Sequence, residues 1–185
     1  MLNKLKKIKP KHILEMLVIL ISFIPGMILR LIKRDIWIVA ENGDDAKDNG
    51  YAFFKYAMEN KSKKDIYYVI TKKSIYYDKL KKYNKNLLYK NSLKHNIYTI
   101  ASTKYISSQI GSGLPFPELV FNFQGTFIYR FKSIFLQHGI TQNKVQCLLK
   151  NESKVDLFCC AGNKEYDFVI NELGYNCLLY TSPSP

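Results

Sequence analysis

The most constraining feature of the sequence is a regular alternation of short apolar runs with segments that carry helical spacing. The runs, rich in β-branched and aromatic residues, cover residues 35–40, 65–71, 86–89, 104–108, 133–137 and 156–160. The helical patterns cover residues 49–60, 75–83, 92–102 and 163–173, with Gly174 ending the last. Continuous short apolar runs are typical of strands buried on both faces. The alternation therefore predicts an α/β fold with a Rossmann-like parallel sheet and right-handed crossovers.

The N-terminal segment, residues 1–34, has a different composition. It carries eight basic residues against one acidic residue, Glu15, and residues 16–29 are uncharged and mostly apolar. A bilayer-spanning helix needs about 20 such residues, and Pro25-Gly26 is expected to interrupt this one. We expect a membrane-associated helix that lies in or dips into the cytoplasmic leaflet, peripheral or monotopic. A cleavable signal peptide and a buried helix of the globular domain are the alternatives.

The formal net charge of +13 favours an anionic membrane surface, nucleic acid or a phosphorylated substrate as the partner. Lysine-rich loops at residues 61–64 and 79–85 account for part of it, and solvated surface loops explain them equally well. A nucleic-acid-binding module is a weaker alternative, because most of the 14 tyrosines fall within apolar runs. We therefore expect an anionic membrane surface as partner and no nucleic acid.

The four cysteines, Cys147, Cys159, Cys160 and Cys177, lack metal-ligand spacing. Adjacent residues of a strand point to opposite faces, so Cys159 and Cys160 do not form a redox pair. We expect a reduced, cytosolic compartment, no metal and no cofactor.

In open α/β sheets, ligands bind outside the carboxyl ends of the strands. This rule selects the polar residues that directly follow the apolar runs. They are Glu41, Asn42 and Gly43, then Ser107 and Ser108, and finally His138 and Gly139.

His138 is the sharpest candidate, because an imidazole at a strand end can accept a proton from an attacking hydroxyl. Gly139 and Thr141 are candidate donors to phosphate oxygens, and Lys144 is a candidate positive charge beside them. A structural histidine with satisfied hydrogen bonds is the alternative for His138. His95 is expected on a surface helix, and the glycines at 111 and 113 mark a turn.

An ordered set of strings resembles the CDP-glycerol glycerophosphotransferase family, which includes teichoic acid primases and polymerases. The strings are 37–43 (WIVAENG), 45–51 (DAKDNGY), 54–56 (FKY), 67–70 (YYVI), 92–95 (SLKH), 106–108 (ISS) and 135–141 (FLQHGIT). The resemblance covers about residues 35–175. Asn42 departs from it, because an arginine is common at this position in the family.

The resemblance implies a GT-B architecture of two Rossmann-like domains, of which residues 35–176 would be the N-terminal, acceptor-side one. The missing C-terminal domain would bind CDP-glycerol. The reaction would move glycerol phosphate to a hydroxyl of a lipid-linked polyol-phosphate or glycan acceptor and release CMP. The family's proposed general base falls on His138. Its acidic N-terminal motif falls on Glu41, Asp45, Asp48 and Asn49, with Asn42 among them, on the acceptor side. Asp48 is equally well explained as a helix cap.

Two further expectations follow from the resemblance. Residues 177–185 (CLLYTSPSP) depart from the family and resemble a translated sequencing adapter, so we expect a non-native tail and a truncated chain without activity of its own. A GT-B glycosyltransferase that uses a nucleotide sugar is the main alternative function, because it would share the sheet and the cleft.

Overall fold

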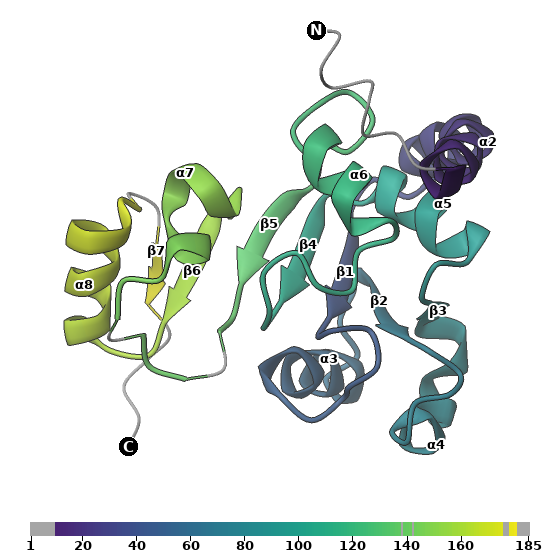
Figure 1. Cartoon of the computed structure of the whole chain (residues 1–185). Helices are drawn as coiled ribbons and strands as arrows, with labels where there is room; N and C mark the ends of the chain where they lie inside the picture. The colour runs from purple at the N-terminus through teal and green to yellow at the C-terminus, as the bar shows by residue number, and fades with distance from the viewer. Residues whose placement is uncertain (1–9, 138, 142, 176–177, 181–185) are drawn as a thin grey trace, which may run out of the picture.

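The computed structural model describes residues 10–137, 139–141, 143–175 and 178–180. Its centre is a seven-stranded sheet in the order β3-β2-β1-β4-β5-β6-β7, parallel throughout (Figure 1). The strands are β1 (Ile36–Ala40), β2 (Asp65–Ile70), β3 (Leu87–Tyr89), β4 (Lys104–Ser107), β5 (Lys132–Phe135), β6 (Leu157–Cys160) and β7 (Leu178–Tyr180). The predicted Rossmann-like α/β fold is confirmed.

The predicted helices lie between the strands in the expected order, and further short helices accompany them. They are α2 (Pro10–Ile32), α3 (Asn49–Glu59), α4 (Tyr77–Leu80), α5 (Leu93–Ala101), α6 (Pro117–Phe123), α7 (Lys150–Ser153) and α8 (Asn163–Leu173), with the 3-10 turns η1 (Lys81–Asn86) and η2 (Gln146–Leu148). Gly174 ends α8 in the left-handed conformation, as predicted (φ 77°). The expected helix over residues 75–83 is instead the short helix α4 followed by η1, within which Tyr83 leaves helical geometry.

Two short helices and one strand were not predicted. α6 begins at Pro117, directly after Phe116 in the left-handed conformation, and spans too few residues to show a helical repeat. α7 is shorter still. β7 pairs with β6 within the segment expected to be a non-native tail, whose origin stays a prediction.

Both faces of the sheet are covered, which explains the continuous apolar runs. On β1, Ile38 and Ala40 face the cluster that includes Ile100 of α5, while Val39 faces Phe54 of α3. All five side chains are fully buried. A one-residue change of register would exchange the two clusters, so burial on both faces fixes each strand in place.

The N-terminal helix α2 runs without a break through Pro25, so the expected interruption at Pro25-Gly26 is wrong. Proline removes one backbone hydrogen bond, but packing against α5 holds the helix together. Gly26 permits this contact, because a Cβ at that position would lie 2.7 Å from the Cγ2 of Ile100. Arg30 of α2 also donates to the backbone carbonyl of Ile100.

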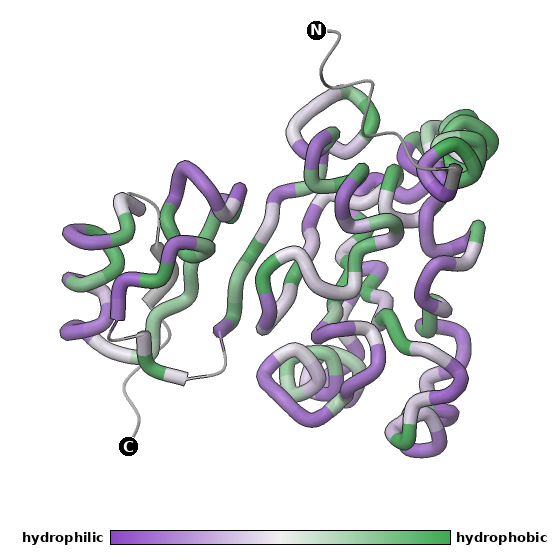
Figure 2. Tube along the Cα trace, in the orientation of Figure 1, coloured by the Kyte–Doolittle hydropathy of each residue, from purple (hydrophilic) through white to green (hydrophobic). Residues whose placement is uncertain are grey.

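The outer face of α2 is apolar and exposed, and Figure 2 shows the helix as a hydrophobic element at the edge of the molecule. Exposed side chains along it include Ile13, Leu14, Leu17, Leu20, Ile21, Ile24, Ile28, Leu31 and Ile32. By length and composition alone, residues 11–32 could cross a membrane, and 17% of their most apolar window is buried. A fully buried core helix, one of the alternatives, does not fit this exposure.

Gly111 and Gly113, which follow β4 and have a left-handed backbone conformation, provide a test of the packing at the carboxyl edge of the sheet. A Cβ at Gly113 would lie 2.4 Å from the Cβ of Ala40, whereas at Gly111 it would meet nothing within 4 Å. We expect Gly111→Ala to lower the free energy of unfolding by about 1–2 kcal/mol, from backbone strain alone. Gly113→Ala should cost about 2–5 kcal/mol, because overpacking adds to the strain. Urea unfolding of both variants measures the difference, and equal losses would contradict the close contact.

Candidate functional site

The order of the sheet reverses between β1 and β4, which makes this the switch point of the fold. The chain leaves β1 toward β2 on one side, while β4 pairs with β1 on the other. The loops that follow β1 and β4 touch each other, since a Cβ on Gly113 would lie 3.1 Å from the carbonyl oxygen of Glu41. Ligands of doubly wound sheets bind in the crevice at this point.

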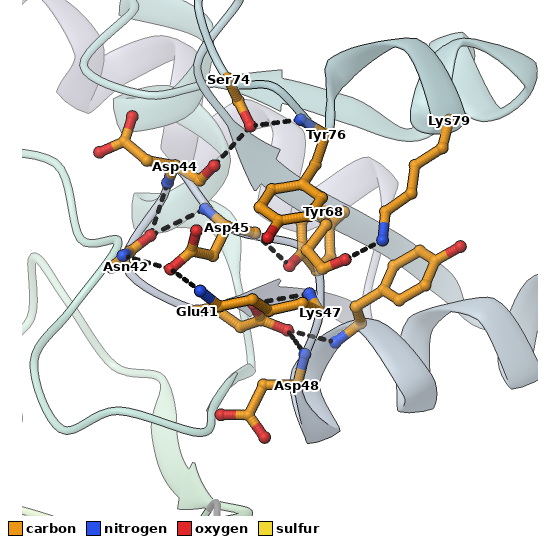
Figure 3. Close-up of polar contacts among 12 residues, drawn as sticks. Glu41, Asn42, Asp44, Asp45, Lys47, Asp48, Tyr68, Ser74, Tyr76 and Lys79 are labelled. Atoms are coloured by element: carbon orange, nitrogen blue, oxygen red, sulfur yellow. Dashed lines mark hydrogen bonds and ion pairs between the residues drawn. The ribbon is translucent and has the colours of Figure 1, made fainter.

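Glu41 follows β1 and is 1% exposed. Its carboxylate accepts backbone N–H bonds from Lys47 (3.1 Å) and Asp48 (2.8 Å), as Figure 3 shows. It also accepts the backbone N–H of Tyr51 (3.0 Å). Lys47 and Asp48 directly precede α3, and Tyr51 lies in its first turn, where N–H groups lack partners within the helix and the helix dipole favours negative charge. Both carboxylate oxygens are engaged, so Glu41 shapes the loop from within.

Asn42 folds the same loop into a tight turn. Its side-chain oxygen accepts the N–H groups of Asp44 (2.7 Å) and Asp45 (2.8 Å), and its amide donates to the Asp45 carboxylate (2.8 Å) (Figure 3). Local bonds of this kind are typical of asparagine in turns. The amide of the Asn42 side chain is therefore committed to the loop.

Lys90, which follows β3, ties this loop to the end of a strand that is two positions away from β1 in the sheet. Its amine donates to the carbonyl of Asn42 (2.7 Å) and pairs with Asp44 at 3.3 Å. A hydrogen bond from Thr71 and the charge of Lys90 hold the pKa of the Asp44 carboxyl below its usual value. Residues that follow β1, β2 and β3 thus form one polar cluster at the sheet edge.

Asp48 is the N-cap of α3, and its side chain accepts the N–H of Asn49 (2.8 Å). This confirms the capping explanation for Asp48. The side-chain amide of Asn49 reaches the loop after β5, where it donates to the carbonyl of Gln137 (2.8 Å). The fold therefore brings Asn49, one of the predicted acceptor-side residues, next to Gln137, which precedes His138 in the sequence.

His138 itself lies outside the described residues, so its catalytic role stays a prediction. The residue before it, Gln137, is buried and adopts a left-handed backbone (φ 46°). Its side chain donates to the carbonyl of Cys159 (3.1 Å) and accepts the hydroxyl of Thr141 (3.0 Å). A non-glycine residue in this conformation costs free energy and persists where its surroundings hold it. Its hydrogen bonds supply that restraint.

Glu165, in the first turn of α8, was not predicted as a site residue. It is 3% exposed and accepts the N–H of Thr141 (2.6 Å) and of Ala161 (2.7 Å). An acidic residue three positions after the helix N-cap is the sequence signal that indicates such a role. Glu165 fixes the loop after β5 as Glu41 fixes the loop after β1.

Two clefts open along this edge of the sheet. The first, of about 530 Å³, is lined by residues after β4 and β5, among them Gln109, Gln137, Gly139 and Thr141. The second, of about 950 Å³, lies over the switch point and is lined by Asn42, Lys90, residues 110–113 and Glu118, among others. Both clefts include Ile110 and Cys147, so they adjoin.

The predicted phosphate-binding residues are only partly brought together. Gly139 lines the first cleft, and its Cα faces open space. Thr141 lines the same cleft, although its N–H and hydroxyl are engaged with Glu165 and Gln137. Lys144 lines neither cleft and pairs with Glu172 at 3.5 Å. The described residues contain no cluster of His, Cys, Asp or Glu that could hold a metal ion.

His95 is fully buried, so its expected position on a surface helix is wrong. The helical pattern of α5 was predicted, but α5 lies between the sheet and α2, which covers what would otherwise be an exposed side. The Nδ1 of His95 accepts the N–H of Asn91 (3.2 Å). Burial, and then the charge of Lys90, lower its pKa to about 3. His95 is therefore a neutral structural residue at pH 7.

Comparison with known proteins gives one informative match. The chain is 33% identical over 141 residues to the minor teichoic acid biosynthesis protein GgaB of Bacillus subtilis (strain 168). The chain is related to part of a teichoic acid biosynthesis protein. The match covers 75% of this chain and 15% of the relative, so the chain spans a small part of that protein's length. No protein-family model and no solved structure matches the chain.

The anchoring role of the buried Glu41 carboxylate can be tested by replacing the residue with glutamine, its amide analogue. Glu41→Gln places an NH₂ group against a backbone N–H and removes the charge, and charge-assisted hydrogen bonds contribute about 1.5–3 kcal/mol each. We expect the free energy of unfolding to fall by at least about 2 kcal/mol in urea unfolding. Glu59→Gln, at an exposed residue paired with Lys55, is the matched control and should change it by less than about 0.5 kcal/mol. Similar small losses in both variants would contradict the anchoring role.

The buried histidine predicts a pH dependence of stability. Because the folded-state pKa of His95 lies below its unfolded value of about 6.5, the unfolded chain binds the proton first as the pH falls. The contribution of His95 is complete above pH 6.5 and is lost toward pH 3, by up to about 1.4 kcal/mol per pH unit. Unfolding measured from pH 7 to pH 5 should show this slope, and His95→Gln should reduce it. An unchanged slope in the variant would contradict the assignment.

Proposed function

We propose that this chain is the acceptor-side part of a transferase in the synthesis of teichoic acid or a related cell-surface polymer. The enzyme moves glycerol phosphate from CDP-glycerol to a hydroxyl of a lipid-linked acceptor. The observation that carries the proposal is the similarity over 141 residues to a teichoic acid biosynthesis protein. The donor is proposed from the resemblance of the strings at 37–43 and 135–141 to CDP-glycerol glycerophosphotransferases.

The arrangement of the loops supports an acceptor site at the switch point. Glu41, Asn42, Asp45, Asp48 and Asn49 lie in one segment, whose internal hydrogen bonds fix the wall of this site. Asn49 joins this wall to the carbonyl that precedes His138. In the proposed reaction, His138 accepts the proton of the acceptor hydroxyl. The hydroxyl oxygen then forms a bond to the glycerol-bearing phosphorus, and the bond between that phosphorus and the CMP oxygen breaks.

Positioning and charge stabilisation account for most of the catalysis of phosphoryl transfer. The first cleft offers Gly139, where the acceptor or the transferred phosphate can approach the backbone closely. Among the described residues that line the two clefts, Lys90 is the one cation, and it is already bound to Asn42 and Asp44. We therefore propose that a second, donor-binding domain supplies the positive charge, and that the 185-residue chain alone is inactive.

We further propose that α2 attaches the protein to the cytoplasmic face of the membrane as a monotopic helix. One side of α2 is occupied by α5, with Gly26 against Ile100, while the other side exposes apolar side chains along its whole length. A helix that crossed the bilayer would have to give up this docked face. A helix that lies in the membrane–water interface keeps its contact with α5, and a lipid-linked acceptor is then presented close to the domain.

A nucleotide-sugar transferase could use the same sheet and the same switch-point cleft. The nucleotide released distinguishes the two reactions, because CDP-glycerol yields CMP whereas a sugar donor yields its own nucleotide. An assay that identifies the released nucleotide therefore tests the identity of the donor as well as the role of the general base.

The proposal is tested in the intact parent enzyme, assayed in membranes with CDP-glycerol and a lipid-linked acceptor. We expect CMP release, and a decrease in rate of about 10²–10⁴-fold in His138→Ala, because a positioned general base contributes that much. Tyr56→Ala, at an exposed residue of α3, is the control and should retain the wild-type rate. Undiminished polymer growth in His138→Ala would disprove the role of the histidine, and turnover of nucleotide sugars alone would disprove the donor.

A further inference from the structure

An apolar groove runs between α2 and the segment that joins α6 to β5. It has a volume of about 700 Å³, and α2 contributes Leu17, Leu20 and Phe23 to one wall. Phe127 and Ile128 contribute to the other wall, and the rings of Phe23 and Phe127 meet edge to face at 5.8 Å. Leu20 is 69% exposed and Phe127 is 61% exposed. The groove is therefore open to its surroundings and continues onto the outer face of α2.

A cationic hollow begins where this groove ends. It has a volume of about 700 Å³ and is lined by Arg130, Lys132, Lys150 and Lys154, with Asp156 as the one acidic residue among the described residues of its lining. Phe127 lines both the groove and the hollow, so the two adjoin.

Much of the positive charge in the hollow is not neutralised. Lys132 pairs with Asp156 at 3.1 Å, whereas the amines of Lys150 and Lys154 donate to the backbone carbonyls of Val155 and Phe121. Arg130 makes no ion pair or hydrogen bond with the residues that the structure describes. Burial, and then the charge of Arg130, lower the pKa of Arg30 on α2, so the two guanidinium groups lie near each other.

An apolar groove that leads into a hollow with three cations outside any ion pair among the described residues, Arg130, Lys150 and Lys154, matches an amphiphile with an anionic head. We propose that α2 and residues 123–130 form a binding site for one anionic phospholipid of the membrane. Its acyl chain lies in the groove along Leu17, Leu20 and Phe127, and its phosphate lies against Arg130. This inference rests on the membrane attachment proposed above and assigns a specific lipid contact to it.

The charge beside the groove is the reason for choosing a lipid over a protein partner. A helix of a second copy would fill the groove but would bring no anion to Arg130, because the exposed face of α2 is apolar. The anionic surface of a membrane provides both components at once, and each Lys or Arg near such a surface contributes appreciably to binding.

Vesicle binding of the full 185-residue chain, without any transferase substrate, tests this inference. We expect stronger binding to vesicles of phosphatidylcholine with phosphatidylglycerol than to vesicles of phosphatidylcholine alone. Arg130→Gln should lower the partition coefficient for the anionic vesicles about fivefold and leave that for the neutral vesicles unchanged. Lys85→Gln, which removes an exposed lysine of η1, is the matched control for net charge and should have a smaller effect.

Separate substitutions test the contribution of the apolar groove to vesicle binding. Leu20→Ser and Phe127→Ser change exposed side chains, so both proteins should fold, and both should bind all vesicles less tightly. Ile75→Ser, at a residue that is 86% exposed and distant in sequence from α2, is the control. Native mass spectrometry in mild detergent should detect one phosphatidylglycerol per wild-type chain and none in Arg130→Gln.

Three outcomes would overturn the inference. Equal binding to the two kinds of vesicle would leave membrane attachment in place but remove the lipid site. An equal loss in Arg130→Gln and Lys85→Gln would show diffuse charge attraction without a site. Failure to bind any vesicle, with self-association through α2, would show that a second copy covers the groove and would refute the attachment as well. None of these results bears on the transfer reaction, which the CMP assay tests separately.

Discussion

The candidate site depends on one buried charge, the carboxylate of Glu41 at the end of β1. An ionised group inside a protein is costly unless hydrogen bonds replace its hydration, and here three backbone amides do so. The same bonds satisfy N–H groups at the start of α3, which would otherwise lack partners. Helix and strand are thereby held at a defined angle, and the loop between them becomes a rigid wall of the switch-point crevice.

A buried glutamate that accepts backbone N–H bonds also fixes the loops on the other side of the cleft. Glu165 joins the loops after β5 and β6, while Gln137, in a left-handed conformation, is bonded to three surrounding groups. Both loops therefore owe their shape to buried polar side chains, and the exposed glycine at 139 lies between these restraints. A parallel sheet with fixed loops at its carboxyl edge is well suited to a reaction that depends on positioning.

Much of the fold could be predicted from the sequence because the responsible signals are local. Burial on both faces makes each strand an uninterrupted apolar run, and the cap at Asp48 and the glycine at 174 mark helix ends by their own chemistry. The site was predicted as a set of strand ends and, from the family resemblance, as an acceptor-side motif at Glu41, Asp45, Asp48 and Asn49. The contact between Asn49 and Gln137 spans 88 positions, and no local pattern indicates it. The position of His95 likewise depends on α2, which covers α5 from a distant part of the chain.

The two clefts meet at Cys147, whose thiol is exposed, whereas Cys159 and Cys160 are buried in β6. Cys147 is therefore the accessible thiol among these three cysteines, and it lies where the two clefts adjoin. A fluorophore or spin label attached to Cys147 would respond to a ligand bound in either cleft, without an engineered cysteine. The rate at which thiol reagents modify this cysteine would report directly on whether an acceptor has entered the crevice.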